Sequence, residues 1–331
     1  MRIVTGGRAV CERPPAIVLS IEGKRSRNVF ASIHGHRMVR PMTIRDTAAP
    51  VETGGGDLAE DLEALAEYEF RIAQTSCVDC NEYHALFSYG RLAGVNYGLA
   101  PDAEIAATAL NKVSPPNARI LIAGAADAGM LAFTARATLD RTPIITVVDR
   151  CATPLAVCRH YAKTHHLRVS TLQADLNKTS IAGPYDVAFT HNVLLFVPEG
   201  RRVTFLTNLG RSLGKGGTLV LINRPRHPKR AEDGALKFGN FTAEIESGLV
   251  TRGIPLPESE VCFRRRLEAA AKSERARSDV TLTLQQIEES LTAAGFCIVE
   301  RVDHHRRRTN ARDGGNGEMV PTYVFTATYL G

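Results

Sequence analysis

The residues with the clearest chemical meaning form a loop between two apolar runs. The first run breaks into small residues within Ile120 to Gly129, ILIAGAADAG, and the second, IITVVD, ends at Asp149. A strand that turns into a helix points unpaired backbone N–H groups at a ligand, and small side chains leave the approach open. An acid that closes the next strand can accept hydrogen bonds from the hydroxyls of a ribose. The spacing predicts a βαβ unit that binds a ribose-bearing ligand.

A second group of residues has the chemistry of metal ligands. Cys77, Cys80 and His84 form the pattern C-x-x-C-x-x-x-H, which could place three ligands on one face of a helix. A fourth ligand is not evident, and no second C-x-x-C follows. Buried or incidental thiols are therefore favoured over zinc, and no metal site is expected.

The elements that must position these residues alternate between apolar runs and helical stretches from residue 119 onward. The expected elements are strand 120–123, helix 128–139, strand 144–148, helix 153–165, strand 168–172, strand 186–190, helix 199–213, strand 217–222, helix 283–294, strand 296–303 and strand 320–329. This order predicts an α/β fold with a doubly wound, mostly parallel seven-stranded sheet. The last two strands have no helix between them, so we expect an antiparallel C-terminal hairpin at the edge of the sheet.

Three further segments surround this α/β unit of residues 117–331. Residues 1–56 are Arg-rich and aperiodic, which favours a disordered basic tail over a transit peptide or a misassigned start. Residues 57–116 have apolar residues at helical spacing and predict a helical leader. Residues 224–280 interrupt the alternation as a largely helical insertion, which we expect to form a cap.

Composition limits the classes of protein to which the chain can belong. Of 331 residues, 44% are hydrophobic and 23% are charged, which is typical of a globular protein, and no apolar stretch is long enough to span a bilayer. The net charge of +6 lies in the first 50 residues, so the remainder is neutral and a nucleic-acid partner is disfavoured. Seven cysteines without a secretory signal predict a reducing, cytoplasmic location.

The order of motifs resembles the class I S-adenosylmethionine-dependent methyltransferases over about 210 residues, from Arg119 to the C-terminus. The matching features are a glycine turn after the first strand, an acid after the second, Ala-Asp-Leu after the third, Gly-Gly before the fifth and a terminal hairpin. The resemblance implies the cofactor S-adenosylmethionine. It also implies these cofactor-binding residues: Gly124, Ala125, Ala126, Asp127, Gly129, Asp149, Arg150, Asp175, Leu176, His191 and Asn192.

The chain departs from the family pattern in two places. Ile122 stands where the family usually places an acid that engages the amino group of the cofactor. The second and third glycines of the family's G-x-G-x-G are Ala126 and Ala128, which preserve the turn only if they avoid positive φ. Backbone carbonyls and Asp127 are the expected replacements at the amino end.

The family's chemistry suggests roles for residues around the methyl group. Methyl transfer from a sulfonium requires alignment and, where needed, a base, and His191 after the fourth strand is the candidate. Alternatively, His191 lines the adenine or caps the following turn. In many relatives an N-terminal segment covers the cofactor, so Tyr83, His84 and Tyr89 are expected to contact substrate as part of a lid, or else to pack the leader onto the sheet.

The favoured function is therefore methyl transfer to O or N of a small-molecule acceptor. The alternatives are a catalytically degenerate binding protein, an RNA methyltransferase that uses the basic tail, and a nicotinamide-dependent dehydrogenase. The dehydrogenase shares the first βαβ unit but predicts neither the hairpin nor Asp175.

Overall fold

A computed structural model describes residues 56–77, 80, 83–95, 98–226, 231–276, 281–307 and 319–331. The basic tail expected over residues 1–56 lies outside the described residues, except for Gly56, which begins the first helix.

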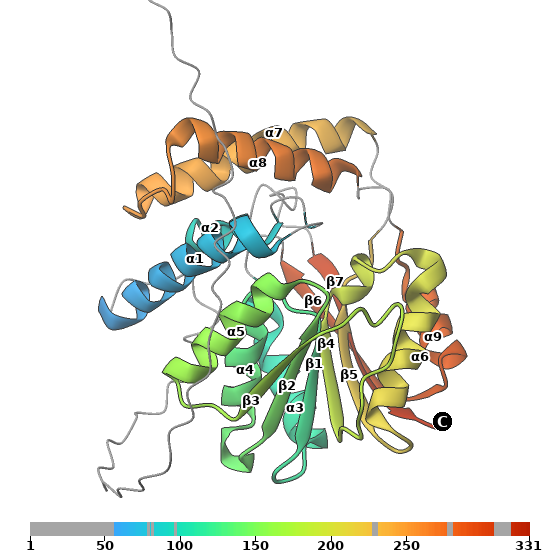
Figure 1. Cartoon of the computed structure of the whole chain (residues 1–331). Helices are drawn as coiled ribbons and strands as arrows, with labels where there is room; N and C mark the ends of the chain where they lie inside the picture. Colours follow the sequence, from blue (N-terminus) through green and yellow to red (C-terminus); the bar gives the residue numbers. More distant parts are fainter. Residues whose placement is uncertain are drawn as a thin grey trace, which may run out of the picture.

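Seven strands form one mixed sheet in the order β3-β2-β1-β4-β5-β7-β6 (Figure 1). The strands are β1 (Arg119–Ala123), β2 (Ile144–Asp149), β3 (Val169–Gln173), β4 (Val187–His191), β5 (Thr218–Asn223), β6 (Phe296–Arg307) and β7 (Met319–Tyr329). The first five strands are parallel, whereas β7 runs antiparallel to β5 and β6. The expected fold class is confirmed, with the terminal hairpin at the edge of the sheet.

Helices cover both faces of the sheet. One face packs against α3 (Ala103–Val113), α4 (Gly129–Ala137) and α5 (Ala152–Thr164), and the other against α6 (Arg202–Leu213) and α9 (Leu284–Ala293). In β1, Ile120 and Ile122 belong to the first core, and Leu121 and Ala123 to the second. Because side chains alternate across a strand, a continuous apolar run supplies both cores.

Four further helices lie beyond one end of the sheet (Figure 1). The leader contains α1 (Gly56–Ser76) and α2 (Tyr83–Leu92), and the insertion contains α7 (Ala231–Thr251) and α8 (Glu260–Ala276). These helices share a third apolar core that includes Phe70, Tyr89, Ile245 and Phe263. The insertion therefore packs directly on the leader.

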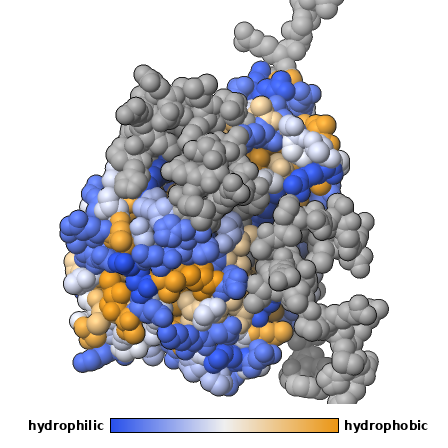
Figure 2. Space-filling model, turned by 180° about the vertical axis from the view of Figure 1, so that it is seen from behind, coloured by the Kyte–Doolittle hydropathy of each residue, from blue (hydrophilic) through white to orange (hydrophobic). Residues whose placement is uncertain are grey.

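Short 3₁₀ turns complete the described chain. They are η2 (Ala100–Asp102), η3 (Leu139–Arg141), η4 (Val193–Leu195) and η5 (Glu199–Arg201). On the face opposite to that of Figure 1, hydrophobic residues gather in one area among hydrophilic ones (Figure 2). Within the described residues, no helix has the length and apolar character needed to cross a membrane.

Candidate functional site

The strand order points to the carboxyl ends of β1 and β4 as the candidate ligand site. From β1 the chain continues to β2, toward one edge of the sheet, and from β4 it continues to β5, toward the other edge. Ligands of open α/β sheets bind where the strand order reverses in this way. Gly124 after β1 has φ of +83°, and a Cβ there would stand 2.9 Å from Cγ2 of Val193 after β4. The close contact between these two segments requires glycine at this turn.

The alanines that replace glycines in the loop adopt ordinary backbone conformations. The described non-glycine residues with positive φ are Asn117, Thr142, His166 and Asn192. Ala126 and Ala128 are not among them, and Ala128 has φ of −76°. The loop therefore keeps its turn without the family's second and third glycines.

Asp149 ends β2 beside this loop, as the sequence predicts. One carboxylate oxygen accepts from the backbone N–H of Ala125 at 3.0 Å, and the other from that of Cys151 at 2.7 Å. Burial raises the pKa of Asp149, and the two backbone hydrogen bonds oppose that rise. Each carboxylate oxygen has a second lone pair, so the group retains acceptor capacity for hydroxyl donors. Its neighbour Arg150 is exposed.

Asp175 follows β3 and lies near the carboxyl end of β2. The backbone N–H of Ala174 donates to the carbonyl of Asp149 at 3.0 Å, so Asp175 follows directly beside that position. One oxygen of Asp175 accepts from both the backbone N–H and the side-chain amide of Asn177. Leu176 is buried in the core of the α6 and α9 face.

The leader reaches the glycine loop through an ion pair. Nη2 of Arg91 on α2 lies 2.7 Å from Oδ2 of Asp127, while Oδ1 of Asp127 accepts from the N–H of Gly129 at 2.8 Å. A Cβ on Gly129 would stand 2.7 Å from the guanidinium nitrogens of Arg91, so the cation lies against the first turn of α4. Asp127 is itself buried, which strengthens the pairing.

A second carboxyl group lies buried near this ion pair. Glu69 on α1 accepts a hydrogen bond from the hydroxyl of Ser88 on α2, and its Oε1 has no protein partner among the described residues. Burial raises the pKa of Glu69, and the charge of Asp127 raises it further. The loop is thus bordered by two acidic groups and one guanidinium.

His191 belongs to a polar cluster that sequence reasoning found only in part. Its Nε2 lies 3.1 Å from Oδ2 of Asp102 on η2, and Nη2 of Arg224, just after β5, donates to the same oxygen at 2.9 Å. The Asn192 side-chain oxygen accepts from the backbone N–H of Arg224 at 2.9 Å. Burial acts to raise the pKa of Asp102, but the hydrogen bond from His191 and the charge of Arg224 lower it well below its usual value.

Asp102 and Arg224 are the members of this cluster that the sequence analysis missed. Arg224 follows β5, which pairs with β4, so its place at the carboxyl end of a neighbouring strand is the signal that could have revealed it. Asp102 comes from the leader and carries no such signal.

The three predicted lid residues have different environments. The Tyr83 ring lies 5.6 Å from that of Phe196, which is half exposed after β4, so α2 meets the segment that follows β4. Tyr89 is buried against Phe70 and Phe263, so its ring packs the leader against the insertion and not onto the sheet, as the alternative role had supposed.

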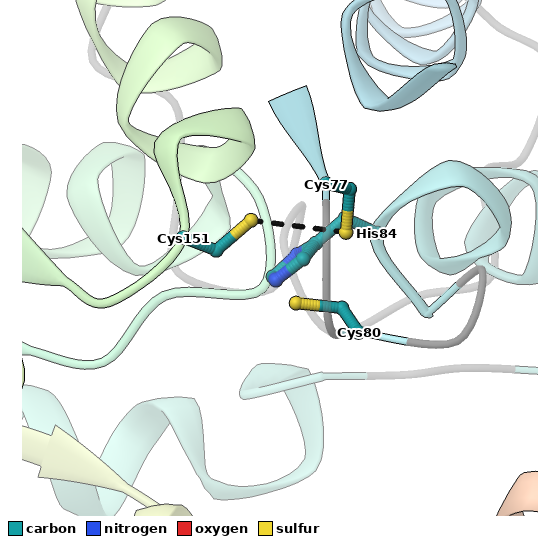
Figure 3. Close-up of side chains that lie close together, drawn as sticks. All are labelled: Cys77, Cys80, His84 and Cys151. Carbon is teal, nitrogen blue, oxygen red and sulfur yellow. Dashed lines mark hydrogen bonds between the residues drawn. The ribbon is translucent and has the colours of Figure 1, made fainter. Parts of the chain in front are cut away.

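His84, the third of these residues, faces the glycine loop rather than open space. Its Nδ1 lies 2.9 Å from the carbonyl oxygen of Ala126. The same histidine belongs to a buried group with Cys77, Cys80 and Cys151 (Figure 3). The fold therefore adds a fourth residue, Cys151, to the pattern that the sequence presented as having three ligands.

Comparisons with known proteins return matches among solved structures. No protein-family model and no curated protein sequence matches the chain. A phosphoethanolamine N-methyltransferase from Haemonchus contortus, solved with S-adenosylhomocysteine, has a TM-score of 0.47 at 13% identity and covers 81% of this chain and 60% of its own. A putative methyltransferase from Bacillus halodurans has a TM-score of 0.46 at 14% identity and covers 69% of this chain and 100% of its own.

The matching structures also include an enzyme that is named for a cyclisation. The [4+2]-cyclase SpnF has a TM-score of 0.45 at 16% identity and covers 69% of this chain and 80% of its own.

Proposed function

We propose that this chain binds S-adenosylmethionine at the carboxyl ends of β1, β2 and β4 and transfers its methyl group to an oxygen or nitrogen atom of a small molecule. The observation that carries the proposal is the meeting of three features at the reversal of strand order. The turn at Gly124, the carboxylate of Asp149 and the imidazole of His191 lie at the carboxyl ends of three neighbouring strands. The turn fits the amino-acid part of such a cofactor, the carboxylate fits its ribose, and the imidazole fits its reacting end.

The residues around the loop fit the charged amino-acid end of the cofactor. Ile122 is fully buried in the sheet and cannot act there. Arg91 lies against the first turn of α4, where the guanidinium and the helix N-terminus both favour an anion such as a carboxylate. Asp127 supplies negative charge for an ammonium group. Arg91 and Asp127 would exchange part of their mutual contact for contacts with the zwitterion.

His191 is the proposed base for an acceptor that must lose a proton. Bound S-adenosylmethionine supplies an electrophilic methyl group whose sulfur leaves without an acid. The contact between His191 and Asp102 orients the imidazole, and a buried carboxylate stabilises the imidazolium that forms when the ring accepts a proton. Arg224 keeps that carboxylate charged. Asp102 and Arg224 are therefore positioning residues.

The segments around the proposed site favour a small acceptor over RNA. The leader contacts the proposed site through Tyr83 and Arg91, and the insertion packs on the leader. Both segments limit the access of a large polymer to the site. Arg264 and Arg266 on α8 are paired with Glu246, Glu260 and Glu258, so this basic cluster is largely neutralised. A pocket that excludes water also suits attack on a sulfonium methyl group.

The first test is calorimetric titration with S-adenosylmethionine and with S-adenosylhomocysteine. We expect binding of both ligands, and weaker binding for Asp149→Asn, which loses the charged ribose acceptor. The matched control is Asp140→Asn, which replaces an exposed carboxylate outside the proposed site. Absence of binding by folded wild type would favour a binding scaffold that has lost the cofactor, one of the sequence-based alternatives.

The second test measures transfer of a labelled methyl group from S-adenosylmethionine to fractionated metabolite extracts and to total RNA. We expect label in a small-molecule fraction, with His191→Ala losing most of the turnover while cofactor affinity is kept. Unchanged turnover in His191→Ala would refute the base assignment. Label that appears only in RNA would refute the small-molecule assignment.

A further inference from the structure

Four potential metal ligands from separate segments of the chain converge inside the molecule. Cys77 follows α1, Cys80 lies in the connection to α2, His84 is in the first turn of α2, and Cys151 precedes α5. All four residues are buried, and their ligand atoms lie within 4.8 Å of one another. Their side chains point toward a common centre (Figure 3). The proposed methyl transfer uses none of the three thiols.

The spacing of the sulfur atoms suits a single tetrahedral ion. Zinc binds thiolate sulfur at about 2.3 Å, which places two sulfurs of a tetrahedral site roughly 3.8 Å apart. The Sγ atoms of Cys77 and Cys151 lie 3.7 Å apart. Three sulfurs and one imidazole nitrogen form a Cys₃His set, which is typical of structural zinc sites without an open position.

The histidine is oriented for metal binding by its second nitrogen. Nδ1 of His84 contacts the carbonyl oxygen of Ala126 at 2.9 Å, an acceptor to which this nitrogen donates its proton. The ring is then the tautomer with its lone pair on Nε2. A backbone carbonyl that holds the non-ligating nitrogen in this way is the usual outer partner of a metal-bound histidine.

We propose that Cys77, Cys80, His84 and Cys151 bind one structural zinc ion that fastens the leader to the sheet. Binding forms three zinc–sulfur bonds and one zinc–nitrogen bond, and the thiol protons pass to solvent. The site touches both cofactor-binding loops, because His84 contacts Ala126 and the N–H of Cys151 donates to Asp149. The site itself does not depend on the proposed methyl transfer.

The test is the zinc content of full-length protein expressed with zinc and purified under reducing conditions, without chelators or immobilised metals. Wild type and Cys297→Ser, whose cysteine is exposed and outside the cluster, should each retain about one zinc per chain. Cys80→Ser and Cys151→Ser should lose most of it. Wild type that binds no zinc, or Cys151→Ser that retains all of it, would overturn the proposal.

Two measurements on wild type keep the proposal testable if those variants do not fold. Replacement of zinc by cobalt should give the intense visible bands of a tetrahedral ion and a thiolate charge-transfer band in the near ultraviolet. The weak spectrum of an octahedral ion would contradict the assignment. Mass spectrometry of protein alkylated during lysis should find Cys77 and Cys151 as modified thiols, and a disulfide between them would also overturn the zinc site.

Discussion

Asp102 is the residue on which the polar cluster at the end of β4 depends. Its side chain is completely buried, and one of its oxygens contacts both His191 and Arg224. A buried carboxylate is stable only when charged partners compensate its loss of water, and here they come from two strands of the sheet. Asp102 thereby fixes the leader to the carboxyl ends of β4 and β5 as well as orienting His191.

The lowered pKa of Asp102 predicts a specific dependence of stability on pH. A carboxyl whose pKa is lower in the folded state stabilises the fold above its unfolded pKa of about 3.9, and this contribution is lost as the pH falls toward the folded value. Asp102→Asn should lower the free energy of unfolding by about 3 kcal/mol near pH 7. The difference from wild type should shrink below about pH 4.

Urea unfolding of both proteins between pH 7 and pH 3 measures this difference. Asp140→Asn, which replaces an exposed carboxylate, should match wild type throughout. A difference for Asp102→Asn that is independent of pH would show that its charge does not contribute.

Arg91 allows the charged end of the proposed cofactor to be tested separately from its nucleoside end. Arg91→Gln should weaken binding of S-adenosylmethionine by about 10- to 100-fold, since one charge-assisted contact is lost. Binding of 5′-methylthioadenosine, which lacks the amino-acid end, should not change. Calorimetry with both ligands makes the comparison, and equal weakening of both would instead indicate a distorted loop.

At the scale of elements, close contact between α2 and α7 joins the insertion to the leader. A Cβ on Gly248 would stand 2.3 Å from the carbonyl oxygen of Ala93, which is backbone and cannot rotate away. Phe263 on α8 contacts both Phe70 and Tyr89 in the same core. The insertion is therefore held by the absence of a side chain at one position and by aromatic packing at another.

This contact predicts the effect of adding one methyl group. Gly248→Ala should destabilise the protein by about 1–2 kcal/mol despite the better helix propensity of alanine, because the helices must separate. Gly200→Ala is the matched control, since a Cβ there meets no atom within 4 Å. Chemical unfolding of both variants measures the difference, and a Gly248→Ala protein as stable as wild type would contradict the close packing.

At the scale of the whole molecule, the leader and insertion share one apolar core, and the sheet is packed by two others. Cys77 and Cys151 both belong to the leader core, although Cys151 comes from the sheet end at β2. The Arg91 and His84 contacts and the Cys₃His group connect this core to the sheet edge. Loss of the proposed zinc ion should therefore loosen the connection between the two parts.

Removal of the metal should lower the melting temperature of wild type by at least about 5 °C, since an ion that binds only the folded state stabilises it. Cys297→Ser should respond as wild type does. Cys151→Ser should melt at a lower temperature from the start and show no response to the chelator. Circular dichroism during heating, with metal loss verified by elemental analysis, gives the values. An unchanged wild-type melting temperature after verified loss would contradict a structural role.

The sequence by itself determined the α/β sheet and located the edge at which we propose that the cofactor binds. Apolar runs bounded by turn residues locate the strands, and Gly124 and Asp149 are local consequences of a tight turn and a strand end. These features can be predicted from the sequence because each depends on residues only a few positions away along the chain.

Only the tertiary structure decided which distant side chains share an environment. Asp102 and His191, and likewise His84 and Cys151, are far apart in the chain and meet because the leader folds over the carboxyl edge. Tyr89 showed the converse, since the family resemblance suggested a lid but its ring is buried in a core with the insertion. Periodicity predicts which face of a helix is apolar, whereas the partner of that face is chosen by packing of the whole chain.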